Sequence, residues 1–184
     1  MRAMKTVTIA LAAAAALAGP ASAEVTKMVG GAAMYPSKTI VENAVNSKDH
    51  TTLVTAVKAA GLVDTLQSSG PFTVFAPTNR AFAKLPPGTV ETLVQPQSKA
   101  TLTKVLTYHV VSGRYTAQDL TALAKRSGGE AQLKTVEGEP LTVMLGKKGG
   151  VFVSDVKGNT ARVTVANVMQ SNGVIHVVDT VMMP

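Results

Sequence analysis

The spacing of apolar positions changes partway along the chain. Up to about residue 126, apolar residues recur every three to four positions, which predicts helices that bury one face. From Glu130 onward they alternate with polar residues, which predicts strands with one buried face. A helix-rich first half followed by a β-rich second half indicates an α+β domain, with an antiparallel sandwich and helices on one side or end.

The helices of the first half are predicted from apolar spacing and from residues that favour helix ends. Residues 40–45 share one face of a first helix, for which Ser37 is the predicted N-cap. A second helix starts near residues 49–52 and ends at Gly61, which can take the left-handed conformation that other residues avoid. Further helices are predicted at 62–66, at 81–85 after a cap at Thr78 or Asn79, at 90–94, at 98–106, and through Leu123 after a capping box of Thr116 and Asp119.

Strands are predicted where β-branched and aromatic residues gather between turn residues. The continuous apolar run Val174–Val178 predicts a strand that is buried on both faces. The predicted strands are 72–76, 108–111, 131–136, 141–145, 151–154, 161–168 and 174–182, with turn residues at 137–138, 147–150, 158–159 and 172–173.

The N-terminal segment has the three parts of a secretory signal. Arg2 and Lys5 precede an apolar run of about 13 residues, and the small residues at 21–23 form an A-x-A cleavage site. The run is shorter than the roughly 20 residues that a membrane-spanning helix needs. We therefore expect residues 1–23 to be removed between Ala23 and Glu24, which would leave an exported protein in the periplasm or outside the cell.

The mature chain is expected to be a single soluble domain. Residues 24–36, without periodicity, are predicted to be a flexible leader, followed by one domain at 37–184. Without Arg2 and Lys5, 16 basic and 11 acidic side chains remain, a formal charge of +5, and no cysteine is present to form disulfides. No second apolar run approaches 18 residues, and no internal repeat is found, so we expect no transmembrane segment and a monomer.

The sequence lacks the residue patterns of common enzymes. There is no G-x-S-x-G string, and His176 and Asp179, three positions apart on a strand, are expected on opposite faces. His50, His109 and His176 are isolated from one another, so we expect no metal and no cofactor. Gly146-Lys147-Lys148 lacks the other residues of a phosphate-binding loop and is expected to be a hairpin turn. No nucleic-acid partner is expected, because few aromatic residues are present and the basic residues of the second half are expected to be dispersed. These basic residues are Lys125, Arg126, Lys147, Lys148, Lys157 and Arg162.

Three strings together resemble the signature motifs of the fasciclin (FAS1) family. They are GPFTVFAPTNRAF from Gly70, LTYHVV from Leu106 and NGVIHVVDTVMMP from Asn172. The resemblance extends from about residue 40 to the end of the chain. It implies a wedge-shaped β-sandwich flanked by helices, in secreted or surface proteins that mediate adhesion and matrix contact. A single domain behind such a signal resembles the small secreted bacterial members.

The resemblance also implies roles for particular residues. It associates ligand contact with Tyr108, His109, Val110 and Val111, to which we add their exposed neighbours Ser112 and Arg114. Because adjacent strand residues point to opposite faces, Tyr108 is expected in the core and His109 near the surface. Structural roles are expected for the motif residues Phe72, Val74, Phe75, Pro77, Thr78, Asn79, Phe82, Val174, Ile175, His176, Val178 and Asp179.

These observations favour a non-enzymatic interaction module that mediates cell adhesion or contact with the envelope or matrix. Its partner is expected to be a cell-surface or matrix protein or a glycan. A second hypothesis is a carrier that holds a small apolar or lipid ligand between the sheet and the helices. Its sequence hint is a set of methionines, since methionine often lines adaptable apolar sites. They are Met144, Met169, Met182 and Met183. A hydrolase is disfavoured because no nucleophile and base are found.

Overall fold

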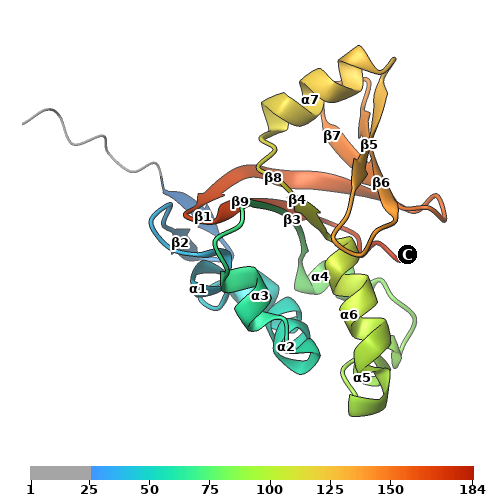
Figure 1. Cartoon of the computed structure of the whole chain (residues 1–184). Coiled ribbons are helices and arrows are strands. Elements are labelled where there is room, and N and C mark those ends of the chain that lie inside the picture. Colours follow the sequence, from blue (N-terminus) through green and yellow to red (C-terminus); the bar gives the residue numbers. More distant parts are fainter. Residues whose placement is uncertain (1–25) are drawn as a thin grey trace, which may run out of the picture.

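A curved sheet of seven strands forms the centre of the protein (Figure 1). The computed structural model describes residues 26–184, so the predicted signal and its cleavage site lie outside the described residues. Neighbouring strands are antiparallel except for β3 and β9, which run parallel. In sheet order the strands are β4 (Val110–Ser112), β3 (Phe72–Pro77), β9 (Gly173–Val178), β8 (Thr160–Gln170), β7 (Val151–Ser154), β6 (Pro140–Leu145) and β5 (Glu130–Lys134).

The sheet bends along β8, so its two ends approach each other. Register shifts interrupt the pairing of β8 with β9, and Asn167 takes a positive φ of 56° there. Such bulges bend a strand and increase its twist. At the far ends, Val111 of β4 bridges to Thr135 just beyond β5, and Val136 donates its N–H to the Val110 carbonyl at 2.7 Å. The sheet therefore wraps into a wedge.

The helices form two groups around this wedge (Figure 1). Helix α7 (Ala117–Arg126) packs against β5, β6 and β7, while the other helices lie beside β3 and β9. Thr39, rather than the predicted Ser37, caps the first helix, and Thr78 caps α4. The other helices are α1 (Ile40–Ala44), α2 (Thr51–Ala60), α3 (Val63–Gln67), α4 (Asn79–Ala83), α5 (Thr89–Leu93) and α6 (Lys99–Tyr108), with 3-10 turns η1 (Lys48–His50) and η2 (Pro96–Ser98).

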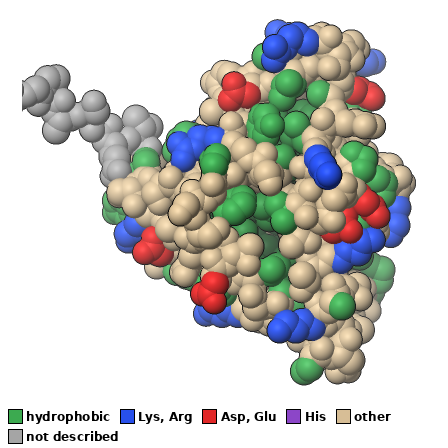
Figure 2. All heavy atoms as spheres, in the orientation of Figure 1, with side chains coloured by type: hydrophobic (Ala, Val, Ile, Leu, Met, Phe, Trp, Pro, Cys, Tyr) green, Lys and Arg blue, Asp and Glu red, His purple; other side chains and the backbone are tan. Residues whose placement is uncertain are grey.

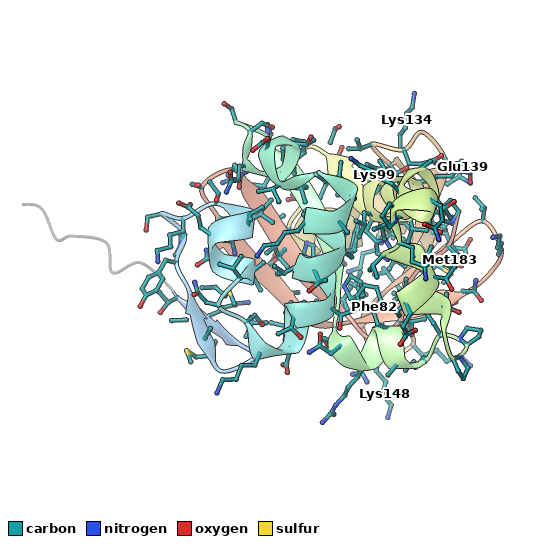
Figure 3. The ribbon with its side chains drawn as sticks, turned by 90° about the horizontal axis from the view of Figure 1, so that it is seen from below. Phe82, Lys99, Lys134, Glu139, Lys148 and Met183 are labelled. Carbon is teal, nitrogen blue, oxygen red and sulfur yellow. The ribbon has the colours of Figure 1, made fainter. Side chains whose placement is uncertain are left out.

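This arrangement creates two hydrophobic cores. One lies between α1–α6 and the strands β3 and β9, and the other lies under α7. Seen from below, Phe82 of α4 lies among the helices of the first core, whereas Lys134 and Lys148 point away from the domain at opposite edges (Figure 3). The expectation of an α+β domain is confirmed, with most helices before most strands.

Two boundaries differ from the sequence predictions. Residues 27–34, expected within a flexible leader, form a hairpin of β1 (Lys27–Val29) and β2 (Ala32–Met34). Val29 and Met34 are buried in the first core, which explains why this short segment is ordered. The last strand ends at Val178 instead of residue 182, although Val181 and Met182 beyond it are buried.

Candidate functional site

Tyr108 is the last residue of α6 and is completely buried. Its hydroxyl donates a hydrogen bond to the Pro140 carbonyl at 2.9 Å and accepts one from the Val156 N–H at 3.2 Å. Burial is the main cause that raises the pKa of Tyr108 above its usual value. The side chain thus joins α6 to β6 and to the loop after β7.

His109, which was predicted near the surface, is buried at 2% exposure. Its Nδ1 bonds to the Val105 carbonyl at 2.8 Å, and its Nε2 accepts a hydrogen bond from the Met182 N–H at 3.0 Å. A carbonyl only accepts and a backbone N–H only donates, so the ring is neutral and protonated at Nδ1. Burial lowers the pKa of His109 to about 4.

The surface prediction for His109 failed because the strand begins later than expected. Tyr108 is still helical, and His109 caps the helix with helical backbone angles. The alternation of faces along a strand therefore does not apply to this pair, and both side chains point into the protein. Val110 and Val111, the first residues of β4, are buried as well.

Of the residues expected to contact a partner, only Ser112 and Arg114 are exposed. The Arg114 guanidinium donates through Nη2 to the carbonyls of Gln170 at 3.3 Å and Ser171 at 3.1 Å. These bonds hold the turn after β4 against the turn between β8 and β9.

Hydrogen bonds bring further turns to the same end of the sheet. The Gly113 N–H donates to the Pro71 carbonyl at 2.9 Å, and the Ser171 N–H donates to the Lys38 carbonyl at 2.9 Å. We call the exposed residues gathered here the turn surface. It comprises Lys38, Ser68, Ser69, Pro71, Ser112, Arg114 and Ser171, which include two cations and no carboxylate.

A buried amide supports the turn surface from below. Asn172 donates to the carbonyls of Leu66 at 2.7 Å and Ser68 at 2.9 Å, and its Oδ1 accepts from the Ile40 N–H at 3.0 Å. One side chain therefore joins α1 and α3 to the start of β9. This role was not predicted, because these contacts join residues about 100 to 130 positions apart.

The residues of the first motif lie on β3 and on α4, which follows it. Val74, Phe75 and Phe82 are buried, and Phe72 is half-buried. Pro77 is the last residue of β3 and Thr78 the cap of α4. The Asn79 side chain instead accepts from the Thr52 N–H at 3.0 Å and donates to the Lys48 carbonyl at 2.9 Å, so it stabilises the start of α2.

The residues of the last motif lie on and just after β9. Val174, Ile175 and Val178 are buried, as is His176, whose Nε2 bonds to the Tyr115 carbonyl at 2.8 Å. Burial lowers the pKa of His176. Asp179 instead accepts from the Arg162 N–H at 2.9 Å, so His176 and Asp179 have separate partners.

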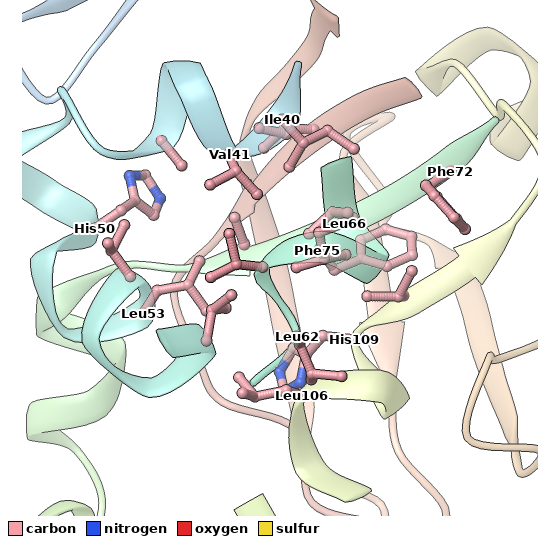
Figure 4. Close-up of a pocket in the computed structure, with 18 of the residues that line it drawn as sticks. Ile40, Val41, His50, Leu53, Leu62, Leu66, Phe72, Phe75, Leu106 and His109 are labelled. Carbon is pink, nitrogen blue, oxygen red and sulfur yellow. The ribbon is translucent and has the colours of Figure 1, made fainter. Parts of the chain in front are cut away.

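An apolar cavity of about 70 Å³ lies between β3, β9 and the helices α1–α3 and α6 (Figure 4). None of the four methionines expected to line such a site borders it, and Met182 is instead buried in the second core. His50, which carried no functional prediction, is one of the lining residues. In the space-filling view, hydrophobic side chains gather in the middle of the face between α3 and α6 (Figure 2).

Within residues 26–184, no three histidine, cysteine, aspartate or glutamate side chains lie close enough together to hold a metal ion. No helix in this part of the chain is long and apolar enough to cross a membrane.

The fold and motifs define the class of the protein. The structure resembles a FAS1 domain pair from the insect cell adhesion molecule fasciclin I, with a TM-score of 0.69 and 20% identity. That likeness covers 79% of this chain and 51% of the other. Residues 48–184 match the Fasciclin domain, so this chain belongs to the fasciclin domain family.

Particular relatives occur in bacteria and in animals. The chain is 48% identical to protein sll1483 of Synechocystis sp. over 169 residues, which cover 92% of this chain and 86% of that protein. It is 35% identical to the immunogenic protein MPB70 of Mycobacterium bovis, over 77% of this chain and 66% of the relative. It is 34% identical to the transforming growth factor-beta-induced protein ig-h3 of Sus scrofa, over 81% of this chain but 20% of that longer protein.

Proposed function

We propose that this protein is a non-enzymatic interaction module that contacts a cell-surface or matrix protein or a glycan through the turn surface. The observation that carries the proposal is the convergence of exposed turns around Ser112 and Arg114, held together by hydrogen bonds. A contact surface held in one conformation loses less entropy when it binds. The turn surface thus replaces the buried Tyr108 and His109 as the proposed contact.

The side chains of the turn surface favour an anionic or hydroxyl-rich partner. Lys38 and Arg114 supply cationic donors, and the serines both donate and accept hydrogen bonds. A surface polysaccharide with carboxylate or sulfate groups, or an acidic protein segment, matches this chemistry.

The family and the sequence support a role outside the cytoplasm. One relative is named as a cell surface glycolipoprotein of Mycobacterium bovis, and the fold is that of part of a cell adhesion molecule. The signal pattern at residues 1–23 agrees with export to the periplasm or beyond. Both ring nitrogens of His109 and of His176 are bonded within the fold, so neither histidine is free to act as a general base.

The experiment is attachment of the purified mature protein to cells of its host that lack the gene. Lys38→Gln combined with Arg114→Gln should reduce attachment several-fold, because it removes both cations of the turn surface. Lys147→Gln combined with Lys148→Gln is the matched control, with the same change of charge in the exposed hairpin between β6 and β7. Thermal unfolding of both variants checks that the fold is retained.

Equal attachment of wild type and the Lys38/Arg114 double variant would place the contact elsewhere on the domain. An equal loss in both double variants would mean that net charge, rather than the turn surface, drives attachment.

A further inference from the structure

The apolar cavity follows the length of β3. Both Phe72, the first residue of β3, and Ala76, near its end, line it. At the usual rise of a strand, these residues are roughly 13 Å apart. Lys58, Thr65 and Thr107 also border the cavity, and all three are exposed or half-buried, so they lie at its rim. The interior is therefore a narrow apolar channel with a polar rim.

One residue that lines this channel has a deeply buried polar atom without a hydrogen-bond partner. His50 is 3% exposed, and its Nδ1 lies 2.9 Å from the Ser47 hydroxyl. Its Nε2 forms no hydrogen bond, the one buried side-chain nitrogen or oxygen without a partner among residues 26–184. Desolvation lowers the pKa of His50, and the nearby Ala76 carbonyl partly opposes this shift, although it forms no hydrogen bond of good geometry with the ring.

The second histidine of the cavity provides an internal comparison. His109 also lines the cavity, yet both of its ring nitrogens are bonded to backbone groups. In Figure 4, His50 lies at one side of the group of lining side chains, and Phe72 lies at the other. Buried polar atoms are nearly always paired, so an unpaired one at the end of an apolar channel marks a position for a ligand group.

We propose that this cavity binds a narrow apolar chain ending in a neutral hydroxyl group, which pairs with His50 Nε2. A hydroxyl both donates and accepts, so it pairs with Nε2 whichever way the hydrogen bond between Nδ1 and Ser47 runs. A carboxylate would lose its hydration in this apolar space, which is unfavourable without a charged partner.

The size of the cavity also restricts the ligand. Its volume of about 70 Å³ is well below the roughly 150 Å³ of a cavity that holds a benzene ring. The ligand is therefore a single chain, whose far end leaves past the rim.

This inference goes beyond the proposed function and does not depend on it. None of the turn-surface residues lines the cavity. Attachment to cells and binding of a long-chain alcohol can therefore be changed separately.

The test is calorimetric titration of the purified mature protein with 1-octanol and, separately, with octanoate at pH 7.5. His50→Asn is the informative variant, because an asparagine can retain the hydrogen bond to Ser47 while removing the atom at Nε2. Loss of one hydrogen bond should weaken 1-octanol binding about 3- to 10-fold. Wild type should bind 1-octanol more tightly than octanoate.

A second variant tests the cavity without changing His50. Val54→Trp should block 1-octanol binding, because Val54 lines the cavity and is half-buried. Val156→Trp is the control, at an exposed valine outside the cavity. The proposal is wrong if wild type binds no 1-octanol, if His50→Asn binds it equally well, if octanoate binds more tightly, or if folded Val54→Trp binds like wild type.

Discussion

At the scale of single residues, Tyr108 and His109 act as internal links rather than as contacts. Tyr108 joins α6 to β6, and His109 joins α6 to the segment after β9. Each does so through a polar atom with partners on backbone groups far along the chain. Their substitution should therefore affect stability first, and the effect should depend on which polar atom is lost.

Tyr108→Phe should lower the free energy of unfolding by about 1–3 kcal/mol, because it removes the two part-buried hydrogen bonds of the hydroxyl with the Pro140 carbonyl and the Val156 N–H, each of which contributes about 0.5–1.5 kcal/mol. Urea unfolding of both proteins measures the change. Tyr35→Phe is the control, since Tyr35 is exposed, and it should unfold like wild type. If both variants unfold like wild type, the Tyr108 hydroxyl contributes no net stability.

Stability should also fall in mild acid because of His109. Its pKa is about 4 when folded and near 6.5 when unfolded, so between these values only the unfolded chain binds the proton. The stabilisation is fully present above about pH 6.5 and is lost as the pH falls towards 4. By pH 4.5 this amounts to about 2–3 kcal/mol.

Urea unfolding at pH 7.5, 5.5 and 4.5 measures this loss. The nuclear magnetic resonance signals of the His109 ring provide a direct check in the folded protein. They should not shift between pH 8 and pH 5.5, and a titration midpoint near 6.5 would contradict the assignment of a buried neutral ring.

At the scale of elements, the parallel pairing of β3 and β9 joins the two longest motifs. Phe72 pairs with Gly173 and Val74 with Ile175. The strands approach so closely at Gly173 that a Cβ atom there would lie 2.2 Å from the Phe72 carbonyl oxygen. The glycine of the last motif is therefore required for the pairing, and not only for a turn.

Gly173→Ala should reduce the free energy of unfolding by about 1–3 kcal/mol or more, because β3 and β9 must move apart to admit the methyl group. Thermal and urea unfolding measure the effect. Gly150→Ala is the matched control, since its new Cβ would make an ordinary contact at 3.5 Å with Phe152. A Gly173→Ala protein as stable as the control would mean that the strands separate without cost.

At the scale of the whole molecule, the N-terminal hairpin completes the first core. Val29 and Met34 are buried against side chains of the helices and of β8 and β9. The domain therefore begins before residue 37, and the hairpin is one wall of the cavity as well as part of the core.

A protein of residues 37–184 should be less stable than one of residues 24–184. The shortened protein lacks the buried side chains of Val29 and Met34. Burial of each contributes at most about 1.5–3 kcal/mol to the free energy of unfolding. Chemical unfolding compares the two proteins. Removal of residues 24–26 alone should have little effect on stability. If all three proteins are equally stable, the hairpin adds no stability and residues 24–36 are only a leader, as the sequence predicted.

Local chemistry along the sequence determined the class of fold and several element ends. Gly61 takes a φ of 71° at the end of α2, and Thr116 and Asp119 form the predicted capping box, because such caps depend on residues within one turn. The change of apolar period likewise predicted helices before strands, and the three motifs together indicated the family.

The tertiary structure alone decided the surroundings of each candidate residue. The helix continues through Tyr108 because both that side chain and His109 find partners on distant elements, which spacing within the sequence does not show. The hairpin at residues 27–34 is ordered by a core built from later parts of the chain. The surroundings of His50 also depend on distant parts of the chain. The strand and helices that line the cavity bury its Nε2 and leave that atom without a hydrogen-bond partner.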